Sequence, residues 1–162
     1  MQTQLKASPL SIERHVFPTL HVEASELENP QGPQTLRTRR RIERNHEDPR
    51  RWMVFLTVEF GSAHEDQPTP YSGKISVQGW FLIAEGYPEE KQAALIQVTA
   101  VSILYGACRE MLASFTARSV HGILSIPSVS FEPVTGPEVK DATAKKKPAK
   151  KAAKTAANPK KK

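Results

Sequence analysis

The chain has 162 residues, of which 38% are hydrophobic and 25% are charged, with a formal net charge of +6. This is the length of one domain with a core of moderate size. Ten of the 23 basic residues lie from Lys140 onward, where Asp141 is the only acid, so the preceding 139 residues carry 13 basic and 16 acidic groups and a net charge of −3. The folded part is therefore mildly acidic, which excludes a body that binds polyanions through its overall charge.

The single cysteine, Cys108, rules out a disulfide within the chain. A free cysteine in an apolar segment usually packs as a small hydrophobe and suits a reducing compartment. The first 17 residues contain no apolar run of signal-peptide length. No segment approaches the about 20 consecutive apolar residues of a membrane span. We therefore expect a cytoplasmic protein.

Four segments have the composition of strands. Residues 12–23 read as a first strand in two pieces, because Pro18 favours an edge position or a bulge. Residues 35–43 alternate weakly, and their arginines favour an exposed strand. Residues 52–60 are rich in β-branched and aromatic side chains, and residues 71–83 alternate polar with apolar, which indicates a sheet with one wet face.

A helical region follows the strands. Pro88 is suited to a helix start, and Glu89 and Glu90 suit the positive end of the helix dipole. This helix is either continuous with the apolar stretch after it or broken near residues 97–100, and it ends by about Ser119 with Gly122 as its stop. Residues 123–131 are extended or strand-like. Strands followed by helices predict an α+β domain with the helices on one face of an antiparallel sheet.

The apolar helix has hydrophobic residues over more of its circumference than packing on one sheet requires. Its apolar residues cover roughly 200° of the circumference, whereas a surface helix needs a stripe of about 100°. The surplus predicts an oligomer, a bound client, or both. The residues that we expect at an oligomer interface are Val101, Leu104, Tyr105, Cys108 and Leu112.

The sequence divides into a flexible N-terminus (residues 1–11), a folded domain (12–137) and a disordered tail (138–162) rich in Lys, Ala and Pro. The tail lacks the large apolar side chains that offset the entropy of ordering. A solubilising role is our first interpretation. Binding to an anionic membrane surface or to nucleic acid are the alternatives.

Catalytic patterns are missing from the sequence. The five histidines have no metal-binding spacing, and the chain has no Gly-rich phosphate loop and no nucleophile elbow. We therefore expect no enzyme, no cofactor and no metal. The arginines of residues 37–51 favour a solvated face, with client or RNA binding as the alternative.

The order of these elements, together with the wording of two of them, resembles the SecB family of export chaperones. The family has a helix with the pattern N-I-L-F/Y-P-Y-A-R-E, a run ending in S-R-G or A-R-G, and a P-V/I-N-F strand. The matching residues here are Ile103-Leu104-Tyr105, Arg109-Glu110, Ala117-Arg118 and Pro127-Ser128-Val129-Ser130-Phe131. The first strand and the pair formed by residues 52–60 and 74–83 also resemble the family, so the resemblance covers roughly residues 12–134.

The resemblance implies a four-stranded antiparallel sheet with two helices packed on one face, assembled as a homotetramer, a dimer of dimers. It implies an ATP-independent holdase that binds unfolded polypeptides in apolar grooves and passes them to the SecA motor for export. The residues that would line the client groove are Leu36, Thr38, Tyr71, Ile75 and Phe81.

Several positions depart from the family pattern. Export members carry an acidic patch that docks the motor, and the matching positions here are Thr19, Glu23, Ser72 and Lys74, so only Glu23 keeps the charge. Two rival hypotheses follow: a SecB-like chaperone dedicated to one partner, such as an antitoxin, and a nucleic-acid-associated protein that acts through its tail.

Overall fold

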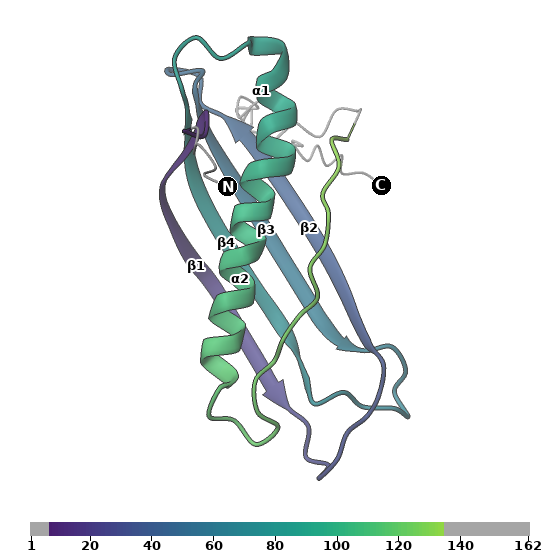
Figure 1. The fold of residues 1–162 in the computed structure, drawn as a ribbon. Coiled ribbons are helices and arrows are strands. Elements are labelled where there is room, and N and C mark those ends of the chain that lie inside the picture. The colour runs from purple at the N-terminus through teal and green to yellow at the C-terminus, as the bar shows by residue number, and fades with distance from the viewer. Residues whose placement is uncertain (1–6, 135–162) are drawn as a thin grey trace, which may run out of the picture.

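The computed structural model describes residues 7–134. It shows a four-stranded antiparallel sheet, with strand order β1-β4-β3-β2, and a long helix lying across one face (Figure 1). The α+β class and the four-stranded antiparallel sheet are confirmed. The elements are β1 (Leu10–Ala24), β2 (Gln34–Arg44), β3 (Arg51–Ser62), β4 (Tyr71–Ile83), α1 (Glu89–Leu95), η1 (Ile96–Ala100) and α2 (Val101–Thr116).

The bounds of the strands and the alternation of their buried side chains agree closely with those predicted from the sequence. β4 has the predicted bounds, and in β3 and β4 alternate residues are buried, as the period of two requires. β1 is an edge strand whose register shifts between Ile12 and Arg14 and again between Val16 and Thr19, so Pro18 lies in an irregular stretch at an edge, as predicted. β1 begins at Leu10, two residues before the expected start of the folded domain.

The prediction of two helices is wrong. The segments α1, η1 and α2 form one continuous helix from Glu89 to Thr116. Residues 97–100 contain neither proline nor glycine, so nothing in them stops a helix. Where the sequence left a break possible, the helix instead contains one π-helical turn, η1, and continues.

The helix is long and apolar enough, over 28 residues, to cross a membrane by length and composition, in contrast to the expectation from the sequence. It packs instead on its own sheet as the central helix of the core. Gly79 on β4 permits the close approach, because a Cβ there would lie 2.7 Å from Leu104 Cδ2 and 2.8 Å from the ring of Phe81. Leu104 and Phe81 are both fully buried.

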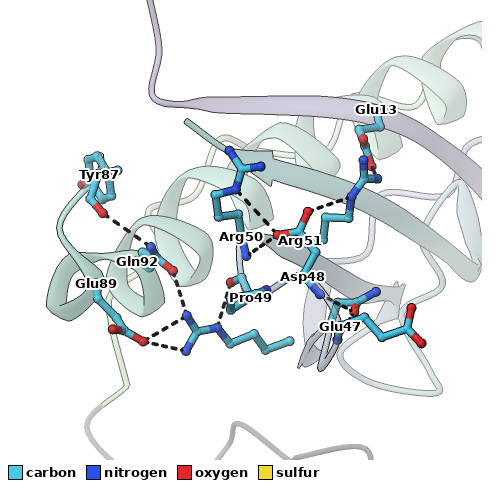
Figure 2. Close-up of polar contacts among 11 residues, drawn as sticks. Glu13, Glu47, Asp48, Pro49, Arg50, Arg51, Tyr87, Glu89 and Gln92 are labelled. Atoms are coloured by element: carbon cyan, nitrogen blue, oxygen red, sulfur yellow. Dashed lines mark hydrogen bonds and ion pairs between the residues drawn. The ribbon is translucent and has the colours of Figure 1, made fainter. Parts of the chain in front are cut away.

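The start of the helix is held over the end of the sheet by the side chain of Arg44. Its guanidinium donates to Glu89 Oε1 at 3.1 Å, to Gln92 Oε1 at 3.3 Å and to the carbonyl of Pro49 at 2.8 Å (Figure 2). Gln92 in turn donates to the carbonyl of Tyr87 at 3.4 Å. The turn between β2 and β3 and the first helical turn are therefore one hydrogen-bonded unit.

The chain leaves the helix at Thr116, three residues before the predicted end. Gly122 has φ +73°, the left-handed conformation in which glycine is favoured, and reverses the chain. Residues 123–134, called here the C-terminal segment, then run back along the helix without regular secondary structure (Figure 1). They are extended as predicted but pair with no strand in the described part of the chain. The predicted disordered tail lies outside the described residues.

Candidate client-binding surface

The C-terminal segment is fastened to the core by side chains that donate to its carbonyl groups. Tyr105 Oη donates to the Pro127 carbonyl at 2.7 Å, and Arg109 Nε donates to the Ile126 carbonyl at 3.0 Å. Partial burial raises the pKa of the Tyr105 hydroxyl, against an opposing effect of the Arg109 charge, so the hydroxyl keeps the proton that it donates.

The far end of the segment is held by Arg40 on the edge strand β2. Arg40 Nη1 donates to the Gln97 carbonyl at 3.1 Å and Nη2 donates to the Glu132 carbonyl at 3.2 Å. The Val134 amide donates to Gln97 Oε1 at 2.7 Å. Gln97 belongs to the π-helical turn η1, so one arginine and one glutamine join the strand, the helix and the C-terminal segment.

A hollow of about 410 Å³ lies between β2 and the C-terminal segment. Among the described strands, β2 pairs only with β3, so its other edge carries backbone groups that have no partner strand. An extended peptide can add to such an edge through main-chain hydrogen bonds while its side chains enter a neighbouring hollow. The side chains around this hollow belong to Thr38, Arg39, Arg40, Ser130, Phe131, Glu132 and Val134.

Apolar side chains also remain exposed in the layer formed by the helix and the C-terminal segment on this face of the sheet. A second hollow, of about 320 Å³, separates the helix from the C-terminal segment near Gly106 and Ile126. Exposed apolar area of this kind typically marks an interaction site when it is contiguous. The client surface, as we define it, comprises the two hollows and the exposed apolar residues of the C-terminal segment, Ile123, Val129 and Val134.

The predicted groove residues separate into two groups. Thr38 lines the larger hollow, and Leu36 is half-buried on the same strand. Tyr71, Ile75 and Phe81 are 2%, 0% and 0% exposed, and they lie in the core beneath the helix. Tyr71 still contributes to the surface indirectly, because its hydroxyl donates to the Gly122 carbonyl at 2.6 Å.

The five residues expected at an oligomer interface are all buried against the chain's own sheet, none more than 3% exposed: Val101, Leu104, Tyr105, Cys108 and Leu112. The apolar surplus of the helix lies instead on Ile103 and Phe115, which are 38% and 57% exposed. The four-residue spacing of Ile103, Ala107, Met111 and Phe115 was the signal for a second ridge.

The positions matched to the motor-docking patch lie together on the face of the sheet opposite the helix, called here the outer face. In the strand register Glu23 pairs with Ser72, Thr19 with Ser76, and His21 with Lys74. Glu23 is the acid among the four matched positions, and its carboxylate lies 3.2 Å from His21 Nε2. An acidic patch is therefore not formed at these positions.

The cysteine of the helix is buried and does not reach this surface. Burial raises the pKa of the Cys108 thiol to about 12, so it is not a nucleophile at neutral pH. In the range 7–134, no group of three or more His, Cys, Asp or Glu side chains is placed to hold a metal ion.

Comparisons with known proteins support the fold. No protein-family model and no curated protein matches the chain. Among solved structures, it is similar to the SecB-like chaperone Rv1957 of Mycobacterium tuberculosis, solved in complex with a ChAD peptide from the HigA1 antitoxin Rv1956. The TM-score is 0.59 at 15% identity, over 75% of this chain and 91% of that one. A protein of unknown function from Streptococcus agalactiae matches at a TM-score of 0.43 and 14% identity, over 76% of this chain and 100% of that one. The similarity to the SecB-like chaperone Rv1957 shows that the chain has a SecB-like fold.

Proposed function

We propose that the protein is an ATP-independent holdase chaperone that binds extended, unfolded polypeptide segments at the client surface. The observation that carries the proposal is the open edge of β2 beside a hollow of about 410 Å³, with exposed apolar side chains along the same layer. Main-chain pairing and unspecific apolar contact together tolerate many client sequences. A cytoplasmic location accompanies the proposal, supported by the free, buried thiol of Cys108.

The client range is a finer proposal with two versions. In the first, clients are preproteins kept competent for export and delivered to SecA. In the second, the protein serves one partner, such as an antitoxin. The lack of an acidic patch around Glu23 favours the second version, and the similar chaperone of Mycobacterium tuberculosis was solved with an antitoxin peptide.

A homo-oligomer is also proposed, with the dimer of dimers implied by the SecB resemblance as its form. The ridge of Ile103 and Phe115 is the part of the helix left for a second copy to cover, because the opposite side is already buried on the sheet. Substitution of both residues by serine should reduce the mass measured by light scattering, whereas an unchanged mass would contradict this interface.

The holdase proposal is tested by dilution of chemically denatured citrate synthase into buffer with the full-length protein and without ATP. The double variant Ile123→Ser/Val129→Ser removes apolar area from the client surface. It should suppress aggregation several-fold less well than the unaltered protein. The control is Leu27→Ser, because Leu27 is 54% exposed and lies in the β1–β2 loop, away from the client surface.

Thermal melts establish that both variants are folded. Equal suppression by the two variants, or no suppression by the unaltered protein, would overturn the proposal. Affinity purification from native cytosol separates the two versions of the client range. Retention of SecA supports export, and a single dominant partner supports the dedicated chaperone.

A further inference from the structure

The outer face of the sheet is a second candidate surface, and it lies on the side away from the helix and the C-terminal segment (Figure 1). Two rows of side chains cross it in the strand register. One contains Arg14, Trp80, Met53 and Glu43, and the next contains Val16, Gln78, Phe55 and Arg41. Within residues 7–134, no helix covers this face.

Apolar and aromatic side chains form a strip across the middle of these rows. Met53, Phe55 and Trp80 are half-buried, and Val16 is 42% exposed. Arginines lie on the aromatic rings: Arg14 Cζ is 3.9 Å from the ring centre of Trp80, and Arg41 Cζ is 4.0 Å from that of Phe55. Such stacking orients the guanidinium groups while leaving donors free for carboxylates.

A ridge of arginines borders this strip on β2. Arg37, Arg39 and Arg41 alternate along the strand on its outer face, and the Arg39 and Arg41 side chains are 77% and 55% exposed. Seven of the 13 basic residues before Lys140 lie between Arg37 and Arg51, although that part of the chain is acidic overall. Of these seven, Arg37, Arg39 and Arg41 lie on the outer face beside the aromatic strip, whereas the Arg40 and Arg44 side chains contact the helix on the other face.

The arginine ridge on β2 is more exposed than the arginines of the neighbouring β2–β3 turn, which are paired with acidic side chains. Arg51 donates to Glu13 at 2.7 Å and to Asp48 at 3.2 Å (Figure 2). The pKa of Asp48 is lowered, first by the hydrogen bond from the Arg50 amide and then by the charges of Arg50 and Arg51, so this carboxylate stays ionised. It forms ion pairs with both arginines. In the ridge, Arg39 Nη2 lies 3.7 Å from Glu59 Oε2 and Arg41 Nε lies 3.1 Å from Glu43 Oε1, but both arginine side chains stay more than half exposed.

Two hollows open on this face beside the ridge and the strip. One, of about 480 Å³, lies between the ridge and β1, with Phe55, Gln78 and Arg39 among its lining residues. The other, of about 430 Å³, is bordered by Trp80, Met53 and Glu43. Each combines an apolar wall with charged groups, which suits a ligand that is partly apolar and partly charged.

We propose that the outer face docks an acidic polypeptide segment that carries apolar side chains. The segment's carboxylates would pair with Arg39 and Arg41, and an apolar side chain would enter the hollow beside Phe55. The charge is opposite in sign to the acidic docking patch that the SecB resemblance implies, so a partner suited to that patch does not fit here. The inference goes beyond the holdase proposal and does not rest on it.

Two other occupants fit less well. A second copy whose two-fold axis passes near the arginine ridge would bring the two ridges together, which like charges disfavour. A single-stranded nucleic acid is the other candidate. Its bases would find the rings of Phe55 and Trp80 already covered by guanidinium groups.

The test uses a fluorescein-labelled 12-residue peptide of Glu and Asp with two Phe residues, titrated with the full-length protein by fluorescence anisotropy. We expect binding that weakens as salt is raised. The double variant R39S/R41S should bind about tenfold more weakly. The matched control is Arg118→Ser, which removes an exposed arginine near the end of the helix and should leave the affinity unchanged.

A charge-reversed variant, R39E/R41E, should prefer a Lys/Phe peptide of the same length, and a thermal melt of each variant establishes folding. Acidic-peptide binding that survives R39S/R41S would assign it to the lysine tail and overturn the proposal. Tighter binding of a 12-nucleotide oligo(dT), lost in R39S/R41S, would overturn it in favour of nucleic acid. Self-association lost in that variant would overturn it in favour of a second copy.

Discussion

The two faces of the sheet are built by the same strands but have opposite chemistry. On the inner face of β3, Val54, Leu56 and Val58 are fully buried beneath the helix layer. On its outer face, Met53 and Phe55 are half-buried and lie among arginines. Strand periodicity thus separates two tasks by one residue, since the inner side chains make the core and the outer ones are available to partners.

This difference in burial between the two faces predicts which substitutions lower the stability of the fold. A fully buried side chain contributes its whole transfer free energy and leaves a cavity when truncated. A half-buried side chain loses less and leaves no closed cavity. Substitutions on the inner face should therefore act mainly on folding, whereas those on the outer face should act mainly on binding.

The largest expected effect is the substitution Leu104→Ala on the inner side. Leu104 is fully buried against Gly79, so its loss should reduce the free energy of unfolding by about 2–5 kcal/mol. Met53→Ala on the outer face should cost about 1 kcal/mol. Urea denaturation followed by circular dichroism measures both. Equal costs for the two variants would show that the faces are not distinct in this way.

The reactivity of Cys108 tests the closure of the inner face by chemistry. Its pKa of about 12, against 9.0 for an unperturbed thiol, lowers the thiolate fraction near pH 8 by about 1000-fold. Alkylation by iodoacetamide should therefore be slower by about that factor than in denaturant, where the same residue is the control. Because the thiol pKa is higher in the folded state, the contribution of Cys108 to the free energy of unfolding is fully present below pH 9. That contribution is lost as the pH rises toward 12. Rapid alkylation of the native protein would contradict the described packing.

A smaller effect is expected where the C-terminal segment is fastened to the inner layer. Tyr105→Phe removes the hydrogen bond to the Pro127 carbonyl and should cost about 0.5–1.5 kcal/mol. Hydrogen exchange in residues 123–134 should accelerate. Tyr87→Phe is the control, because in the described part of the chain the Tyr87 hydroxyl makes no hydrogen bond. Unchanged exchange in Tyr105→Phe would mean that the segment is held by its apolar contacts alone.

The sequence predicted the sheet well because strand periodicity is a local signal. β4 has the predicted bounds, and the irregular edge strand at Pro18 follows from the missing amide of proline. A continuous helix was one of the two alternatives left open by the sequence, and the absence of proline and glycine from residues 97–100 favours it. The π-helical turn at residues 96–100 was not predictable, since it carries no residue signature of its own. In the structure that turn meets Arg40, a partner 57 residues away from Gln97 in the chain.

The client surface was predicted only in part for the same reason. Thr38 was expected at the groove from the SecB resemblance, but the hollow beside it exists because the C-terminal segment lies next to β2. Hydrogen bonds from Tyr71, Tyr105 and Arg40, all remote in sequence, fix that path. Tyr71 and Ile75 lie on the apolar side of the alternation in β4, the face that the helix covers, so alternation alone would have placed them in the core.

The smallest expected effect concerns the stability contribution of the arginine ridge. Arg39 and Glu59 are 3.7 Å apart, and the Arg39 side chain is 77% exposed, so a double-mutant cycle with R39S and E59Q should give a coupling of about 0.2–1 kcal/mol that disappears in high salt. The same R39S change, combined with R41S, is expected to weaken the acidic peptide about tenfold. A large coupling that resists salt would make the ridge part of the scaffold. A small coupling together with a large loss of peptide binding would make the outer face a surface for recognition, in contrast to the inner face.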